Sequence, residues 1–332
     1  MLIWDYDVLI KMKLEEIGFY TLLDSRARES SPTSNMKRCE VILTDACNFK
    51  CPYCRGIRED FAGTMPIEDA MMLVDYWAWD NLESIRFTGG EPTIYPHIVQ
   101  LVKHAKARGI KNIALSTNGS APMKKYNELI DAGVNDMSIS LDACCSADGE
   151  IMAGGVVGSW DRVVSNIKEI SKRCYVTLGM VFVEETVSTV NDVVRFGSEL
   201  GVADIRVITA AQYNQTMTHL IDIDQDLLDK HPILAYRVKN FRNNRNVRGL
   251  KETDSHKCGI MMDDSAVVGD SHFPCIIYLR EGGDPIGKVS PTMRQERIDW
   301  LNTHDTHNDP ICKNNCLDVC IDYNNKWRVF HE

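Results

Sequence analysis

Six short β-rich runs, separated by stretches with helical periodicity, constrain the fold of this 332-residue chain more than any other feature. Strands that alternate with helices imply right-handed βαβ crossovers and therefore a parallel sheet. Six such units can form either a doubly wound sheet or an incomplete barrel. The candidate functional loops described below all follow strands, where parallel (β/α) architectures place their active sites, and this favours the barrel. The six runs are 38–44, 84–88, 112–117, 136–141, 175–183 and 204–209.

Apolar stripes with helical spacing predict the helices between these runs. The clearest stripe consists of Ile98, Leu101, Val102 and Ala105, and similar stripes lie within 160–167 and 190–197. Six strands alternating with five helices are expected, which is an α/β fold.

The composition indicates a globular protein, since 44% of the residues are hydrophobic and 25% are charged. A formal net charge of -10 disfavours a nucleic-acid partner, because that binding depends on a basic surface. We find no apolar run long enough to span a bilayer and no signal-like opening, so no membrane partner is expected. Twelve cysteines in such a chain indicate a reduced, cytoplasmic protein whose cysteines serve metal binding.

The loop that follows the first run carries Cys47, Cys51 and Cys54, with Tyr53 directly before the last cysteine. Three thiolates on one short loop can ligate three irons of a 4Fe-4S cluster and leave the fourth iron open to a small molecule. The alternatives are a zinc knuckle or a disulfide cluster. Zinc sites usually present Cys-x2-Cys pairs that close a tetrahedron, which three thiolates do not. The spacing therefore favours iron and sulfide.

This Cys-x3-Cys-x2-Cys spacing resembles that of the radical S-adenosylmethionine (SAM) superfamily. The resemblance implies a partial (β/α)6, TIM-like barrel over about 38–214. It implies a catalytic 4Fe-4S cluster on Cys47, Cys51 and Cys54 whose open iron binds SAM, and reductive cleavage of SAM to a 5'-deoxyadenosyl radical that abstracts a substrate hydrogen. It also implies an external electron donor, a flavodoxin or ferredoxin.

A glycine-rich turn after the second run matches the SAM motif of that superfamily. It contains Gly89, Gly90 and Glu91. Glycines let the backbone approach a ligand closely, and Glu91 can accept a hydrogen bond from an ammonium group. Alone, this turn is weak evidence, because a tight strand-to-helix turn is the alternative, but its position one βα unit after the cysteine loop makes the match strong.

Polar residues at the next strand ends complete the expected SAM site. Ser116 and Asn118 lie at the end of the third run and just after it, and Ser140 lies near the end of the fourth. In relatives, such groups contact the ribose or methionine of SAM, although turn capping is the alternative role. The aromatic ring of Tyr53 would lie beside the adenine, which relatives shelter on the fifth strand, here 178–181.

A second group of cysteines occupies the C-terminal part of the chain, which resembles the SPASM/twitch extension of radical SAM enzymes. Five cysteines favour one auxiliary 4Fe-4S cluster, because a full SPASM domain has more. We expect Cys258, Cys275, Cys312 and either Cys316 or Cys320 to ligate it, with a zinc site as the alternative. If 312–320 is helical, its three cysteines lie on one face.

The chain is expected to divide into four parts. They are an N-terminal extension (1–37), the radical SAM barrel (38–214), a linker (215–257) and a SPASM/twitch-like auxiliary cluster domain (258–332).

Two further pairs of residues are weaker candidates. Cys144 and Cys145 follow the fourth run, where a thiol can donate a hydrogen atom to a substrate radical or form a thioether, although loop packing is favoured. His304 and His307 can face a metal, but they lie in a polar stretch and are expected at the surface.

Three functions remain open. The first is a maturase that modifies a peptide or protein side chain by epimerisation, crosslinking or oxidation. The second is a small-molecule or nucleotide enzyme that resembles the GTP cyclase of molybdopterin synthesis, although the C-terminal residues lack the paired glycines of that cyclase. The third is a non-catalytic metal-binding interaction protein, which the intact cysteine motif and Glu91 disfavour.

Overall fold

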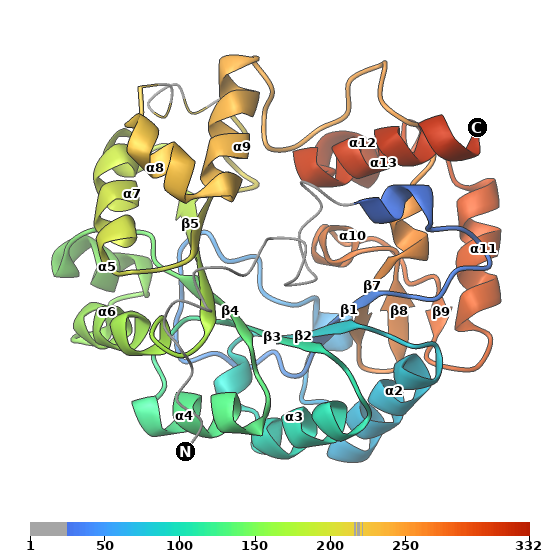
Figure 1. Cartoon of the computed structure of the whole chain (residues 1–332), viewed down its shortest axis with the longest axis horizontal. Coiled ribbons are helices and arrows are strands. Elements are labelled where there is room, and N and C mark those ends of the chain that lie inside the picture. Colours follow the sequence, from blue (N-terminus) through green and yellow to red (C-terminus); the bar gives the residue numbers. More distant parts are fainter. Residues whose placement is uncertain (1–24, 216, 218–219, 221) are drawn as a thin grey trace. The chain divides into compact units, whose positions relative to one another are not determined.

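The structure is a computed structural model that describes residues 25–215, 217, 220 and 222–332 (Figure 1). Residue contacts divide the chain into two compact units. Within the described residues, unit 1 contains Cys47–Arg55 and Leu115–Val247, and unit 2 contains 25–46, Gly56–Ala114 and Arg248–Glu332. The domain boundaries expected from the sequence stay a prediction.

All six expected strands are present, and three more strands follow them in the C-terminal part. The strand order ends at β6 on one side and at β9 on the other, so the sheet is not closed within the described residues. The α/β class with a parallel, incompletely closed sheet is thereby confirmed. The strands are β1 (Arg38–Ile42), β2 (Ser84–Thr88), β3 (Asn112–Thr117), β4 (Asp136–Ser140), β5 (Tyr175–Phe182), β6 (Asp204–Thr209), β7 (Asp264–Val268), β8 (Ser271–Phe273) and β9 (Gly287–Lys288).

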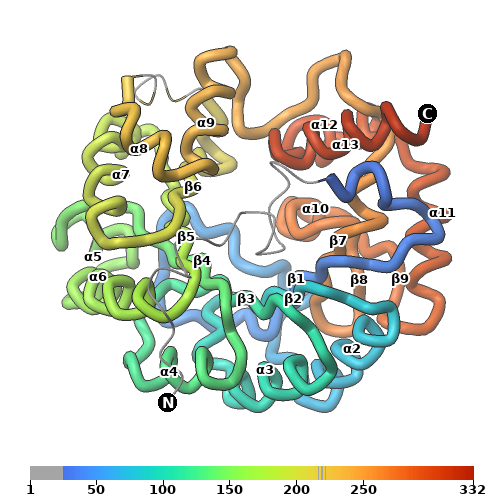
Figure 2. Tube along the Cα trace, in the orientation of Figure 1, coloured from blue at the N-terminus to red at the C-terminus, as the bar shows by residue number. Residues whose placement is uncertain are grey.

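In unit 2, β1 pairs in parallel with β2 on one side and with β7 on the other. Arg38 lies opposite Ser84 in one register and opposite Asp264 in the other. Figure 2 shows β1 and β7, which are far apart in sequence, running side by side. β8 and β9 continue the sheet in antiparallel pairs. The helices of unit 2 are α2 (Ile67–Trp79), α3 (Ile98–Ala107), α10 (Ile276–Arg280), α11 (Met293–Thr303), α12 (Pro310–Asn315) and α13 (Asp318–His331).

In unit 1, β4, β5 and β6 are parallel, with Ser140 opposite Gly179 and Gly179 opposite Arg206. Two helices rather than the expected one connect β4 to β5. The additional helix is α5, a segment of seven residues whose sequence carries too short an apolar pattern to be recognised. The helices of unit 1 are α4 (Met123–Ala132), α5 (Ser146–Met152), α6 (Ser159–Ile170), α7 (Val190–Glu199), α8 (Gln225–Lys230) and α9 (Pro232–Arg242).

The predicted apolar stripes face the interior. All four residues of the α3 stripe are fully buried, as are Val190, Val193 and Val194 of α7. Burial of these faces against the sheet is the main source of helix stability, since isolated helices of this length are marginal in water.

The range 215–257, expected to be a linker, instead contains two helices. α9 packs against β6 and buries Ile233, Leu234, Val238 and Phe241. The carboxylate of Asp204, at the start of β6, accepts a hydrogen bond from the Ile233 amide at the start of α9. This range is rich in polar and charged residues, so the sequence did not indicate that apolar helix face.

None of the helices in the described part of the chain combines the length and the apolar character needed to cross a bilayer.

Candidate active site and cysteine-rich pocket

The loop that carries Cys47, Cys51 and Cys54 belongs to unit 1. Cys47 and Cys54 are exposed and Cys51 is half-buried. A tight turn brings the last two together, with the Cys54 amide donating to the Cys51 carbonyl at 3.0 Å. The Phe49 amide lies 3.4 Å from Cys47 Sγ. The loop therefore presents its thiols in a compact group, two of them open to solvent.

Burial raises the pKa of the Cys51 thiol to about 12, and the charges of Asp142, Cys54 and Cys47 contribute in that order. The thiols are thus close enough to influence one another, and Cys51 stays protonated without a compensating cation. An iron-sulfur cluster supplies that positive charge and takes thiolate ligands. The three residues fit a cluster by number, exposure and chemistry.

The segment after α5 holds this loop in place. The Lys50 amide donates to the Ala153 carbonyl at 3.1 Å. Gly154, with φ +82°, lies so close that a Cβ there would meet the Lys50 carbonyl oxygen at 2.6 Å. Sequence reasoning missed Gly154, whose only signal is the Gly-Gly pair it forms with Gly155.

Asparagine side chains form a second support. Nδ2 of Asn48 donates to Ser120 Oγ at 2.8 Å, and Nδ2 of Asn118 donates to Asn48 Oδ1 at 2.9 Å. Nδ2 of Asn118 also lies 4.0 Å from Cys47 Sγ. Asn118, predicted to bind SAM, therefore lies beside the cysteine loop and orients it.

Tyr53 is fixed by a carboxylate that sequence reasoning did not select. Its hydroxyl donates to Asp142 Oδ2 at 2.5 Å, and the Val181 amide donates to Asp142 Oδ1 at 2.7 Å. Burial raises the pKa of Asp142 to about 6, an increase that these two hydrogen bonds oppose. Burial and the charge of Asp142 hold the pKa of Tyr53 far above its ordinary value. The signal available was an acidic residue just after a strand.

Ser116 and Ser140, the other two residues of unit 1 predicted to bind SAM, lie at the carboxyl ends of β3 and β4. Ser116 is half-buried and Ser140 is exposed. Their role toward SAM stays a prediction.

Cys144 and Cys145 follow β4. Cys144 is half-buried, and Cys145 is exposed with its thiol 3.3 Å from Asp148 Oδ2. The role of either thiol toward a substrate radical stays a prediction.

In unit 2, the glycine-rich turn packs directly on the end of the β1 segment. The Gly90 amide donates to the Thr44 carbonyl at 2.7 Å, and the Glu91 amide donates to the Ala46 carbonyl at 2.9 Å. A Cβ on Gly90 would meet the Ala46 carbonyl oxygen at 2.2 Å. Glycine is therefore required at 90 because two stretches of backbone approach closely.

Glu91 is buried and caps the short 3-10 helix Pro92–Ile94. Its Oε1 accepts hydrogen bonds from the Thr93 amide at 3.1 Å and the Thr93 hydroxyl at 2.6 Å. This structural role was not expected from the sequence, and the interaction of Glu91 with an ammonium group stays a prediction.

All five C-terminal cysteines line one cavity in unit 2. Burial raises the pKa of Cys258 to about 11 and that of Cys275 to about 12, and it raises those of Cys312, Cys316 and Cys320 further. A dense group of buried thiols that are neutral in the absence of a cation fits a metal centre. Apart from Ser255, Thr306 and Asn324, the rest of the wall is largely apolar and includes Leu250, Ile260, Pro274, Ile277, Ile311 and Leu317.

The last three cysteines do not share one helix. α12 ends at Asn315, Cys316 is extended, and α13 begins at Asp318. An antiparallel bridge between Arg248 and Leu317 occupies the break. The single helical face considered for Cys312, Cys316 and Cys320 is therefore wrong, yet the break still leaves all three at the same cavity.

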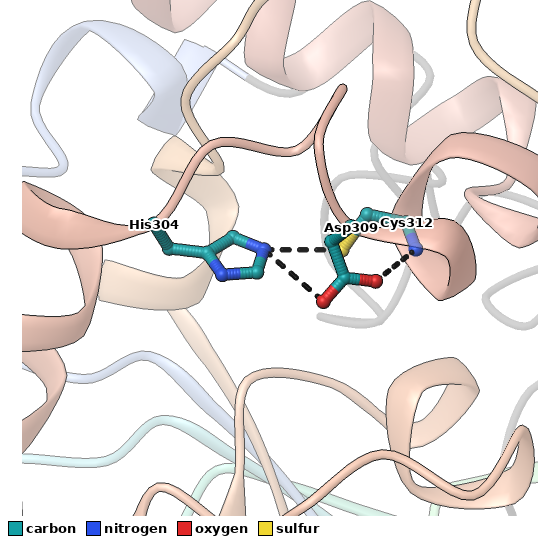
Figure 3. A group of neighbouring side chains, drawn as sticks. All are labelled: His304, Asp309 and Cys312. Atoms are coloured by element: carbon teal, nitrogen blue, oxygen red, sulfur yellow. Dashed lines mark hydrogen bonds and ion pairs between the residues drawn. The ribbon is translucent and has the colours of Figure 1, made fainter.

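The two histidines expected at the surface have different surroundings, and Figure 3 shows those of His304. The His304 side chain is only 15% exposed, and its Nε2 lies 3.6 Å from Cys312 Sγ and 3.6 Å from Asp309 Oδ2. His307 instead stacks on His256 with ring centroids 4.0 Å apart, and its Nε2 lies 3.2 Å from the Asp254 carbonyl. Sequence reasoning missed the group His304, Asp309 and Cys312, because a polar stretch gives no sign of its tertiary neighbours.

Residues 41–197 match the family described as Radical SAM superfamily. The chain is therefore an enzyme that contains a domain of the radical SAM superfamily, as the spacing of Cys47, Cys51 and Cys54 implied. Membership of that superfamily implies a 4Fe-4S cluster and SAM as cofactors. The match ends before the C-terminal cysteines, so the SPASM/twitch-like assignment of 258–332 stays a prediction.

Among curated proteins, the chain is similar to GTP 3',8-cyclases. A probable GTP 3',8-cyclase of Sulfurisphaera tokodaii is 25% identical over 225 residues, which is 64% of this chain and 71% of the relative. The GTP 3',8-cyclase of Chlorobaculum tepidum is 35% identical over 106 residues, 31% of this chain and 32% of the relative. The chain thus spans about seven tenths of the first relative and about a third of the second.

Solved structures with a similar fold include Streptococcus suis SuiB bound to precursor peptide SuiA. That likeness has a TM-score of 0.59 at 16% identity and covers 84% of this chain and 66% of SuiB. Histidine-tagged anSMEcpe with bound AdoMet has a TM-score of 0.58 at 15% identity, with 89% of this chain and 96% of that chain covered. At these identities the likeness shows the fold alone.

Proposed function

We propose that this radical SAM enzyme abstracts a hydrogen from a peptide or protein side chain and so matures its substrate. The observation that supports this most directly is the cavity lined by five cysteines, which offers a complete set of four ligands for an auxiliary cluster. A fully ligated cluster can accept the electron that a side-chain oxidation or crosslink releases. The fold shared with SuiB, whose structure contains a precursor peptide, is consistent with this proposal.

Each cofactor has proposed ligands on this chain. When bound, the catalytic cluster and SAM supply reductive cleavage of SAM to a 5'-deoxyadenosyl radical. Cys47, Cys51 and Cys54 hold the cluster, and Asn118 and Asp142 keep their loop in position. The residues proposed to bind SAM are Tyr53, Gly89, Gly90, Glu91, Ser116, Asn118 and Ser140.

The electron donor is proposed to be a flavodoxin or ferredoxin. Exposure of Cys47 and Cys54 supports this, because a donor protein must approach the cluster closely. The rest of the chain has to keep water and stray C–H bonds away from a reactive radical, so positioning provides most of the catalysis.

A second candidate is a small-molecule enzyme that acts on a nucleotide. The similarity to a probable GTP 3',8-cyclase over 64% of the chain favours it. GTP is the probe that separates the two proposals.

The first experiment measures iron and sulfide after anaerobic reconstitution of the whole chain. About eight irons per chain, and about four in the Cys47→Ala/Cys51→Ala/Cys54→Ala variant, would support one catalytic and one auxiliary cluster. An iron-free native chain would contradict both clusters. Zinc without iron in the triple variant would contradict the auxiliary cluster alone.

The second experiment assigns the substrate class. Peptides from cells that produce the native chain are compared by mass spectrometry with peptides from cells that produce the Cys47→Ala variant. A peptide that is 2 Da lighter, or that gains deuterium from D2O, only with the native chain would establish side-chain modification. GTP-stimulated formation of 5'-deoxyadenosine together with a new nucleotide product would instead establish the second candidate.

A further inference from the structure

Cys312 differs from the other four C-terminal cysteines in its surroundings. Its Sγ lies 3.6 Å from Nε2 of His304, which lies 3.6 Å from Oδ2 of Asp309 (Figure 3). The three side chains offer a sulfur, a nitrogen and an oxygen within 4.8 Å of one another. Nitrogen, sulfur and carboxylate oxygen are the ligand set of zinc.

These distances suit one metal ion rather than two irons of a cluster. With Zn–N and Zn–S bonds of about 2.0 and 2.3 Å and tetrahedral angles, the N and S atoms are about 3.5 Å apart. The corresponding N···O separation is about 3.4 Å. The observed contacts of 3.6 Å lie within about 0.2 Å of both values. Ligands on different irons of a cubane point away from each other, so His304 and Cys312 suit a shared ion.

Neighbouring rings hold the His304 imidazole in its orientation. It stacks on Trp300 with ring centroids 3.8 Å apart and planes 17° from parallel. Tyr278 meets it edge-on at 6.3 Å. Trp300 and Tyr278 also line the cavity, so the ring is packed at the cavity wall.

Asp309 is equally constrained. Its Oδ1 accepts hydrogen bonds from the Ile311 and Cys312 amides and so caps α12, which ties the carboxylate to the backbone of Cys312. Its Oδ2 accepts a hydrogen bond from the Tyr278 hydroxyl at 2.9 Å. A hydrogen-bonded carboxylate and a packed imidazole are the supports that metal ligands ordinarily have.

The other four C-terminal cysteines, Cys258, Cys275, Cys316 and Cys320, line the same cavity as Cys312. Four thiolates complete the ligation of a 4Fe-4S cluster. Cys312, which has the side chains of His304 and Asp309 beside it, is then the fifth cysteine, which such a cluster does not need.

We propose that His304, Asp309 and Cys312 form a mononuclear site for a divalent transition metal, Zn2+ by its ligands, and that Cys258, Cys275, Cys316 and Cys320 hold the auxiliary cluster. Three protein ligands leave the fourth position to water or to an incoming ligand, an arrangement typical of reactive rather than structural zinc. The zinc site does not depend on the proposed function, whereas the ligands of the cluster rest on it.

The test measures zinc and iron separately in the anaerobically reconstituted whole chain. Zn2+ is titrated against a chromogenic chelator, and iron is then counted. The native chain is expected to bind one zinc, and His304→Ala to bind it at least tenfold more weakly with its iron unchanged. His307→Ala is the matched control and is expected to retain both metals.

Variants of the cysteines separate the two centres. Cys312→Ala is expected to lose zinc and keep about eight irons, whereas Cys316→Ala is expected to fall to about four. Loss of about four irons in Cys312→Ala or His304→Ala would overturn the assignment. So would a native chain without zinc, or a His304→Ala chain that binds zinc as tightly as the native chain.

Asp309→Asn tests whether zinc binding can be lost while the chain stays folded, because asparagine caps a helix as well as aspartate does but carries no charge. It is expected to retain the native thermal midpoint and to bind zinc more weakly. X-ray absorption at the zinc edge gives an independent result. One sulfur near 2.3 Å with nitrogen or oxygen ligands supports the site, and three or four sulfurs overturn it.

Discussion

The hydroxyl of Tyr53 lies 2.5 Å from Oδ2 of Asp142 and ties the cysteine loop to the end of β4. The same carboxylate accepts the Val181 amide at the end of β5. One buried carboxyl group therefore fixes the loop between two strands of unit 1.

Replacing Tyr53 with phenylalanine should raise the pKa of Asp142 above its present value of about 6. The hydroxyl stabilises the charged carboxylate, so its removal favours the protonated form. Carbon-detected NMR titration of labelled aspartate measures the change. Tyr95→Phe, which removes a hydroxyl bonded to the Met65 carbonyl, is the control, and equal titration in all three chains would contradict the prediction.

Replacing Gly154 with alanine should displace the cysteine loop and lower iron binding at the catalytic cluster. Gly155→Ala is a matched control, since Gly155 has a similar φ of +84° but open space where a Cβ would lie. Both variants bear the strain of a left-handed alanine, roughly 1–2 kcal/mol. Only Gly154→Ala adds the clash with Lys50. Iron content and thermal midpoints of the two variants isolate that clash, and identical iron contents would disprove it.

Asp204→Asn should change how stability depends on pH. Burial raises the pKa of Asp204 to about 7, so the folded state holds its proton more tightly than the unfolded state, where the pKa is near 4. The native chain therefore loses stability as pH rises from about 4 to about 7, by up to about 1.4 kcal/mol per pH unit. The variant lacks this loss, while its amide oxygen can still accept from Ile205 and Ile233.

Urea unfolding at pH values across that window checks the prediction, with the difference between the two chains as the quantity of interest. The contribution of the buried His231 to the pH dependence cancels in that difference, because its pKa, lowered to about 4, affects both chains alike. Parallel stability profiles would show that Asp204 does not titrate in the window.

Arg297→Gln should destabilise unit 2 by about 3 kcal/mol or more, because it leaves buried carbonyl oxygens without a donor. The fully buried guanidinium of Arg297 donates to the carbonyls of Met261 and Phe273 at 2.9 and 3.0 Å. Arg294→Gln, on the same helix but half-buried, should cost much less. Chemical denaturation of both variants measures the difference, and equal losses would contradict the role of burial.

The sequence predicted those features whose signal is local. The strands follow from β-rich runs, the α3 and α7 faces follow from their apolar spacing, and the three cysteines proposed to hold the catalytic cluster all lie on one short loop. The contact between Tyr53 and Asp142 could not be predicted, because the two residues are 89 positions apart. Cys312 is only eight residues from His304, but the polar sequence between them gives no sign that the thiol lies beside the imidazole.

The sequence also did not predict which charged and polar groups are buried, because their burial depends on tertiary contacts. Arg297 lies in a helix whose sequence is largely polar, yet it is fully buried. Its guanidinium donates hydrogen bonds to the backbone carbonyls of Met261 and Phe273. The helices within 215–257 were missed because the charged and polar residues of that range conceal the apolar ones that face β6.

Because β7 pairs with β1, the cysteine-rich tail cannot be cut away from unit 2 without cost. A chain shortened at residue 257 would leave the peptide groups along one side of 38–42 as an open strand edge, a template for intermolecular pairing. It would also remove Asp263, which forms an ion pair with the buried guanidinium of Arg38. Such a truncated protein should aggregate rather than yield a separate radical SAM barrel, so the proposed metal sites are best studied by point substitution.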